Sequence, residues 1–402
     1  MVRQVGNVNY NKSGLLQVLP MYASRMTNLP PYLFARIDEM KAEQQKKGVD
    51  IIDLGVGDPD LPTPDHIVTS LCKAAKNPEN HHYPSYVGMP AYRGAVADWY
   101  KNRFGVSLDP GKEVVALMGS KDGIAHIPEA FVNPGDYVLA PSPGYPVYRT
   151  GTLFAEGIVH EMPLTRENGF VPVLDDIPKK VIKSAKLMFI NYPNNPTAAV
   201  APDGFYREVV DFARENNIVV VSDNAYSEIA FDGYSAPSFL QTQGAMEIGI
   251  EMHSLSKTYN MTGWRIGMAV GNKDILAGLG RVKTNVDSGV FNAVQHAAIT
   301  ALSGSQDCVK EACAIYQERR NVLIAGLRDL GFDVPAPKAT FYVWLAVDDC
   351  MAFSATLLND AGIVVTPGIG FGSSGEGYIR FAITRPVVRI QEAIERMRGL
   401  DL

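Results

Sequence analysis

The 402-residue sequence has only four cysteines, and they form no recognisable pattern. Cys72, Cys308, Cys313 and Cys350 include no C-x-x-C pair, and no histidine stands near them at the spacing of zinc ligands. We therefore expect neither a disulfide framework nor a metal site. Reduced thiols of this kind are typical of a cytoplasmic protein.

Long apolar runs and excess positive charge are also missing. No stretch approaches the roughly 18 uninterrupted apolar residues of a membrane span, and residues 1–13 lack the apolar region of a secretory signal. Lys and Arg number 37 against 43 Asp and Glu, which gives a net charge of −6. An acidic protein is poorly suited to coat polyanions. We therefore predict a cytoplasmic protein with no nucleic-acid partner and no membrane partner.

Between residues 60 and 300, short apolar runs alternate with helical patterns. The runs that predict strands are 113–118, 137–140, 187–191, 218–222, 249–254 and 265–270. Several are almost continuously apolar, as expected for strands buried on both faces of a mostly parallel sheet. Helical segments separate most of them, which indicates the α/β class.

The rhythm changes after about residue 290. A long helical pattern at 310–330 precedes short strands at 341–346, 363–366 and 378–383, with helices at 351–361 and 387–398. This pattern is typical of a smaller α+β unit, and we expect the N-terminal segment to pack with it because chain ends often lie close together. We predict a large domain at 60–300 and a discontinuous small domain formed by 1–59 and 301–402.

The most informative motif is Ser-Leu-Ser-Lys-Thr-Tyr-Asn-Met-Thr-Gly-Trp-Arg at residues 254–265. A loop lysine such as Lys257 is usually a solvated surface residue. Here Ser254, Ser256 and Arg265 flank it, and hydroxyls with a guanidinium are suited to hold a phosphate. A lysine beside a phosphorylated aldehyde can form a Schiff base.

Three other strand ends carry residues that fit such a group. Asp223 follows an apolar strand; it is commonly a helix cap, but its carboxylate could pair with a pyridinium nitrogen. Tyr226 and Asn195 could both reach the ring's phenolic oxygen, although Asn195 lies in an Asn- and Pro-rich segment that also predicts a plain turn. Gly119-Ser120-Lys121 opens a helix, whose free N–H groups bind phosphate.

Taken together, strand-Asn-Asn-Pro, strand-Asp-x-x-Tyr, Ser-x-Ser-Lys and Gly-Trp-Arg resemble the motifs of the class I and II aminotransferases. These are fold-type I enzymes that use pyridoxal 5′-phosphate (PLP). The resemblance extends from about residue 30 to the C-terminus. It implies a large domain with a mostly parallel central sheet between helices, a small α+β domain, and transamination with an amino-acid donor and a 2-oxo acid acceptor.

The resemblance also implies a role for each matching residue. Lys257 is expected to be catalytic, to bind the cofactor covalently and to move a proton. Tyr86 would reach the phosphate of a neighbouring subunit, which requires a homodimer with its active sites at the interface. The expected cofactor-binding residues are Tyr86, Ser120, Lys121, Tyr145, Asn195, Asp223, Tyr226, Ser254, Ser256, Lys257 and Arg265.

Substrate contacts follow in the same way. Arg380 would hold the substrate α-carboxylate, where bidentate geometry favours Arg over Lys, and Gly57 would allow a close backbone approach. The expected substrate-binding residues are Tyr32, Gly57, Lys121, Tyr145, Asn195, Ser288 and Arg380, of which Ser288 would come from the partner subunit.

Segments 32–37 and 260–265 are most similar to those of LL-diaminopimelate aminotransferases. That similarity implies transfer of the amino group of LL-2,6-diaminopimelate to 2-oxoglutarate in lysine biosynthesis. An aspartate- or alanine-type aminotransferase, or a PLP β-lyase, stays open as an alternative. A non-enzymatic regulatory domain is disfavoured because no winged-helix extension is visible.

One departure from the family pattern is Ala198, where Gly usually follows Asn-Pro-Thr. Because Ala adopts a positive φ less readily than Gly, the local turn could differ from that of the family. We expect activity to be retained, since Asn195 is intact.

Overall fold

The computed structural model describes residues 22–29 and 33–400. The chain divides into two compact units, Met1–Pro31 and Tyr32–Leu402. In the first unit, the described segment carries the short helix α1 (Ser24–Thr27). The second unit contains the elements that bear on the predicted site.

A seven-stranded sheet forms the centre of the second unit, in the order β2-β8-β7-β6-β5-β3-β4. Strands β3 to β7 pair in parallel, whereas β8 is antiparallel to both of its neighbours. The predicted mostly parallel α/β sheet is therefore confirmed. Its strands are β2 (Val114–Leu117), β3 (Tyr137–Ser142), β4 (Ile158–Pro163), β5 (Ala185–Ile190), β6 (Val219–Asp223), β7 (Gly249–Ser254) and β8 (Gly267–Gly271).

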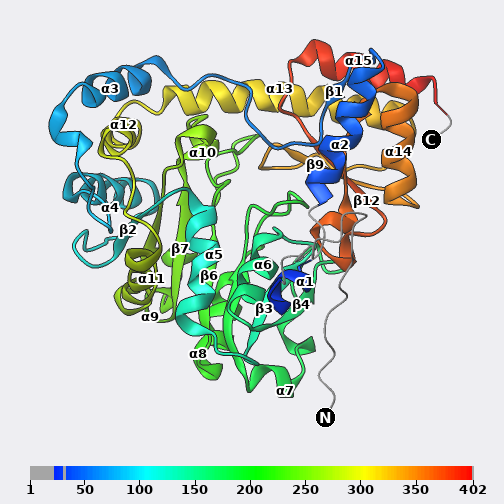
Figure 1. Ribbon diagram of the computed structural model, residues 1–402. Helices are drawn as coiled ribbons and strands as arrows, with labels where there is room; N and C mark the ends of the chain where they lie inside the picture. The colour runs from blue at the N-terminus through cyan, green and yellow to red at the C-terminus, as the bar shows by residue number, and fades with distance from the viewer. Residues whose placement is uncertain (1–21, 30–32, 401–402) are drawn as a thin grey trace, which may run out of the picture. The chain divides into compact units, whose positions relative to one another are not determined.

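Helices cover both faces of this sheet, as Figure 1 shows. On β5, Met188 and Ile190 belong to one buried apolar cluster, and Leu187 and Phe189 belong to another. Apolar side chains on both faces explain the nearly continuous apolar runs. The helices that contribute to the first cluster include α4 (Pro90–Phe104), α8 (Phe205–Asn216) and α12 (Asn292–Ser303); those of the second are α5 (Ser120–Phe131), α6 (Val147–Phe154) and α11 (Lys273–Val286).

Strand β4 was not predicted. It pairs only with β3, at the edge of the sheet, and most of its residues are partly exposed. An edge strand needs no continuous apolar run, so its sequence, Ile-Val-His-Glu-Met-Pro, carries little strand signal.

A third apolar cluster contains no buried residue from the strands of the large sheet. There, β1 (Ile52–Asp53) pairs in parallel with β10 (Ile363–Val364), so these two segments lie side by side although they are far apart in the sequence. A second, three-stranded sheet has the order β11-β12-β9. Its strands are β11 (Thr366–Pro367), β12 (Tyr378–Ala382) and β9 (Tyr342–Ala346). The boundaries at residues 60 and 300 stay a prediction.

The helical patterns read from the sequence are confirmed. Helix α13 (Asp307–Asp329), yellow in Figure 1, extends from the neighbourhood of α12 to α15. The patterns at 351–361 and 387–398 form α14 (Cys350–Ala361) and α15 (Val387–Arg398), and the structure also has the helices α2 (Leu33–Lys46) and α3 (Asp65–Ala75). Within residues 22–29 and 33–400, no helix is both long and apolar enough to cross a membrane.

The fold brings the sequence motifs to one edge of the large sheet. Because β5, β6 and β7 are parallel neighbours, their carboxyl ends meet there. Asn191 follows β5, Asp223 ends β6, and Ser254 ends β7 just before the short helix α10 (Leu255–Thr258).

Candidate active site

A cavity of about 600 Å³ opens at this edge of the sheet. It brings together most of the predicted site residues, which come from segments far apart in the chain. The predicted residues that line it are Gly57, Ser120, Lys121, Tyr145, Asn195, Asp223, Tyr226, Ser254, Ser256, Lys257, Arg265 and Arg380.

Lys257 lies in α10, and its Nζ donates a hydrogen bond to the carbonyl oxygen of Gly57 at 2.8 Å. The pKa of this amine is lowered from 10.5 to about 8, mainly by burial and also by the charges of Arg380 and Arg265, while Asp58 acts in the opposite direction. A substantial neutral fraction is therefore present near physiological pH, as a nucleophile or general base requires.

The two carboxylate oxygens of Asp223 differ in their hydrogen bonding to the described residues. Its Oδ2 accepts a hydrogen bond from the hydroxyl of Tyr148 at 2.8 Å. Its Oδ1 is buried and has no hydrogen-bond partner among the described residues. Burial raises the pKa of this carboxyl to about 6. A buried oxygen of this kind calls for a ligand that donates an N–H or carries positive charge.

The loop after β5 is fixed by its own amides. The backbone N–H of Asn195 donates to the side-chain oxygen of Asn191 at 2.8 Å, and the Asn191 amide donates to the carbonyl of Asp223 at 2.7 Å. Arg380 donates to the side-chain oxygen of Asn195 at 2.8 Å. The amide nitrogen of Asn195 therefore remains as the donor for a ligand.

A cluster of hydroxyl and guanidinium groups lies at the start of α5 and around α10. Arg265, in the left-handed region with φ +54°, donates to the carbonyls of Thr262 and Met118 at 2.8 and 3.1 Å. A Cβ at Gly119 would collide with this guanidinium, so glycine allows Arg265 to lie against the start of α5. The hydroxyl of Ser256 is buried and has no partner among the described residues. These groups fit a phosphate.

Arg380 is held between two aromatic rings that no sequence motif marks. Its guanidinium carbon lies 4.2 Å from the ring centroid of Tyr342 and 4.6 Å from that of Phe371. It also donates to the carbonyl of Gly55 at 2.7 Å. A side chain at Gly57 would collide with the Tyr342 hydroxyl, so glycine is required there for packing as well as for ligand access.

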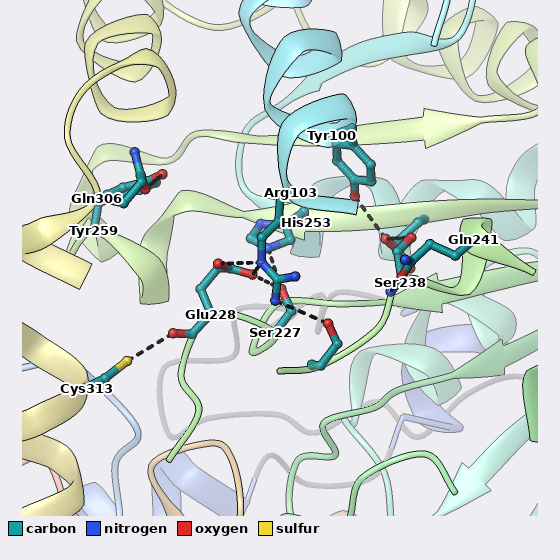
Figure 2. A network of polar contacts seen from close by, with 12 residues as sticks. Tyr100, Arg103, Ser227, Glu228, Ser238, Gln241, His253, Tyr259, Gln306 and Cys313 are labelled. Carbon is teal, nitrogen blue, oxygen red and sulfur yellow. Dashed lines mark hydrogen bonds and ion pairs between the residues drawn. The ribbon is translucent and has the colours of Figure 1, made fainter. Parts of the chain in front are cut away.

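Figure 2 shows a polar network that includes residues next to two site residues in the sequence. Ser227 and His253 adjoin Tyr226 and Ser254 in the chain, and they share a hydrogen bond of 3.0 Å. The Ser227 hydroxyl also donates to Glu228, which pairs with Arg103 at 3.0 and 3.1 Å. The network therefore connects the segment after β6, which carries Tyr226, and the end of β7, which carries Ser254, to α4.

Two predicted residues within the described part of the chain do not line the cavity. Tyr86 is 48% exposed and Ser288 is exposed, so neither contacts the site of its own chain. Tyr32 lies outside the described residues. Their expected roles, two of which depend on a second subunit, stay predictions.

The turn at Ala198 keeps a left-handed conformation. Ala198 has φ +59°, and its N–H donates to the Asn194 carbonyl at 2.9 Å. Alanine therefore adopts a conformation that glycine would adopt with less strain. Its methyl group is buried in the third apolar cluster.

Substitutions at Ala198 should separate strain from packing. In Ala198→Gly, relief of about 1–2 kcal/mol of backbone strain is offset by the loss of a buried methyl group (about 0.8 kcal/mol) and by the greater freedom of the unfolded chain. We therefore expect the free energy of unfolding to change by less than about 1 kcal/mol. In Ala198→Val, a β-branched residue at positive φ should cost more than about 2 kcal/mol. Urea unfolding measures both; equal stability of the two variants would contradict the observed φ.

Comparison with known proteins identifies the family of the chain. The family model described as aminotransferase class I and II matches residues 49–397. The LL-diaminopimelate aminotransferase of Desulforudis audaxviator is 58% identical over 380 residues, covering 94% of this chain and 97% of the relative. That of Syntrophobacter fumaroxidans is 59% identical over 382 residues, covering 94% and 98%.

Solved structures show the same fold. Substrate-bound BacF from Bacillus subtilis superposes with a TM-score of 0.92 at 38% identity, covering 96% of this chain and 98% of that one. Aspartate aminotransferase from Thermus thermophilus with maleate superposes with a TM-score of 0.88 at 28% identity, covering 95% and 100%. The chain thus belongs to the class I and II aminotransferase family.

Proposed function

We propose that the protein is a PLP-dependent aminotransferase that transfers the amino group of LL-2,6-diaminopimelate to 2-oxoglutarate, giving tetrahydrodipicolinate and glutamate in lysine biosynthesis. The observation that carries the chemistry is the partly buried Lys257 amine, with a pKa of about 8, in one cavity with Asp223 and Arg380. The choice of donor is supported by curated LL-diaminopimelate aminotransferases that are 50–59% identical over about 94% of this chain.

The residues of the cavity fit PLP. The cofactor supplies, when bound, an electron-poor ring that stabilises negative charge at the substrate α-carbon. Lys257 would hold it covalently, and Asp223 Oδ1 would accept the ring N–H. Asn195 and Tyr226 would donate to the ring hydroxyl oxygen, and Tyr145 would lie against the ring face. Ser120, Lys121, Ser254, Ser256 and Arg265 would surround the phosphate.

With its amine freed by the substrate, Lys257 would take the proton from the substrate α-carbon as a base and later give that proton up as an acid. Arg380 would orient the α-carboxylate through two parallel hydrogen bonds. Its two aromatic neighbours restrict its movement, so that little entropy is lost when it binds. The rest of the substrate would be contacted by Lys121, Tyr32 and Ser288.

We also infer a homodimer with active sites at the interface. Tyr83, Tyr86 and Phe291 are 89%, 48% and 44% exposed. A Cβ at Gly289 would lie 2.7 Å from the carbonyl oxygen of Ser85, so the loop before Phe291 packs against the segment that carries Tyr86. Exposed aromatic side chains on adjoining loops are typical of protein interfaces. The four free cysteines support a cytoplasmic location.

Amino-donor profiling of the purified, PLP-loaded protein with 2-oxoglutarate tests the proposed reaction. We expect glutamate to form with LL-diaminopimelate at a kcat/KM well above that with aspartate or alanine. If aspartate or alanine were turned over well and no glutamate formed with LL-diaminopimelate, the proposed donor would be wrong. Release of pyruvate and ammonia from cystathionine would indicate a β-lyase.

A further inference from the structure

Helix α6 places Tyr148 directly behind Asp223. Tyr148 is 1% exposed and does not line the cavity, whereas Asp223 does. The Tyr148 hydroxyl donates to Asp223 Oδ2 at 2.8 Å. This bond approaches the carboxylate from the protein side and leaves Oδ1, which is buried and lacks a partner among the described residues, as the oxygen available to a ligand.

The position of the Tyr148 ring is fixed by its neighbours. It stacks on Phe189 of β5, with ring centroids 4.8 Å apart and an interplanar angle of 19°. It also meets the ring of Tyr145 edge-on at 5.8 Å and 82°. The hydroxyl is therefore a rigid donor, and a rigid donor restricts the carboxylate of Asp223 to one rotamer.

Several groups act on the charge of Asp223. Burial raises its pKa, the hydrogen bond from Tyr148 and the Ala225 backbone lower it, and Glu251 on the adjacent strand β7 raises it. Tyr226 faces Asp223 from the following loop. Glu251 is itself buried and accepts hydrogen bonds from Tyr100 and Ser238. The Tyr148 hydroxyl is thus a side-chain donor that favours the ionised carboxylate.

We propose that Tyr148 is a positioning residue for the aminotransferase reaction: it orients Asp223 and stabilises its anion, so that Oδ1 can accept the ring N–H of the cofactor. This proposal rests on the proposed function and deepens it. It also assigns complementary tasks to the neighbouring tyrosines of α6 and the preceding turn, because Tyr145 would contact the ring face while Tyr148 acts only through Asp223.

Tyr148→Phe tests the proposal in the PLP-loaded protein because it removes the donor and keeps the ring stacking. We expect kcat to fall about 10- to 100-fold with KM changed less than about threefold, and the acidic limb of the kcat–pH profile to move to higher pH. Tyr92→Phe is the matched control. Tyr92 is fully buried and donates to the Gly267 carbonyl at 2.9 Å, so we expect its loss to leave kcat within about twofold.

A second measurement does not depend on turnover. NMR of cofactor-free protein with ¹³C-labelled aspartate carboxyls follows the titration of Asp223, whose signal is identified by its loss in Asp223→Asn. The carboxyl pKa of Asp223 should rise in Tyr148→Phe and stay unchanged in Tyr92→Phe. If Tyr148→Phe fails to fold, 3,5-difluorotyrosine at position 148, a stronger donor, should lower that pKa instead.

An unchanged Asp223 pKa would overturn the proposal, as would a wild-type kcat–pH profile in Tyr148→Phe. If the wild-type protein shows no transamination with any donor, the proposed function fails, and the carboxyl titration still decides the role of Tyr148.

Discussion

Replacement of Lys257 by alanine is expected to lower kcat for LL-diaminopimelate by at least about 10³- to 10⁴-fold, because the variant loses both the covalent anchor of the cofactor and the base at the α-carbon. The amine lies in the cavity beside the Gly57 carbonyl, and its lowered pKa suits it to both tasks. Steady-state rates measure the loss, and the absorbance of the bound cofactor should change because its link to the protein is absent.

Lys257→Arg is the appropriate control, since it keeps a positive charge but cannot form the link or accept a proton near neutral pH. We expect it to be as inactive as Lys257→Ala. If either variant kept the absorbance and rate of the wild type, the covalent anchor would have to lie elsewhere.

Replacement of Arg380 by lysine should have the second largest effect. Arg380 is 3% exposed and fixed between Tyr342 and Phe371, so a lysine cannot reproduce its two parallel hydrogen bonds to a carboxylate. Loss of one partner of a buried charge pair costs about 2–5 kcal/mol, which corresponds to a decrease in kcat/KM of roughly 30- to several thousand-fold.

The matched control for Arg380 is Arg320→Lys. Arg320 is equally buried, at 3% exposure, but pairs with Asp232 and does not line the cavity. We expect this variant to lose stability at most, with kcat/KM close to that of the wild type. A kcat/KM for Arg380→Lys within about twofold of the wild type would show that another group reads the α-carboxylate.

Lys257 and Arg380 are also linked through pH. With a pKa of about 8, the Lys257 amine of the cofactor-free protein becomes neutral as the pH rises, so the rate of PLP capture should increase up to about pH 8 and then level off. Arg380 is one of the groups that lower this pKa. In Arg380→Ala the curve should therefore move to higher pH. Stopped-flow absorbance measures the capture rate; a pH-independent rate would contradict the lowered pKa.

Much of the site could be predicted from sequence because its chemistry lies in local motifs at strand ends. Asn195, Asp223 and Lys257 each follow a short apolar run, and the parallel order of β5, β6 and β7 places their carboxyl ends at one edge. Once a parallel sheet is inferred, the convergence of such residues follows from topology.

The contacts between distant segments could not be read in this way. Arg380 lies in a late strand, and the two rings that enclose it, Tyr342 and Phe371, belong to separate segments with no shared motif. Tyr148 did carry a signal in the sequence, because it is a second tyrosine only three residues after the predicted site residue Tyr145. Its bond to Asp223 still depends on how α6 packs on the sheet.

The most direct test of the proposed activity is the half-reaction of PLP-loaded protein with LL-2,6-diaminopimelate in the absence of 2-oxoglutarate. We predict that the cofactor is converted to its amine form once per active site, that an equal amount of tetrahydrodipicolinate appears, and that added 2-oxoglutarate restores the original absorbance. No conversion by LL-diaminopimelate, with full conversion by aspartate or alanine, would contradict the proposed activity.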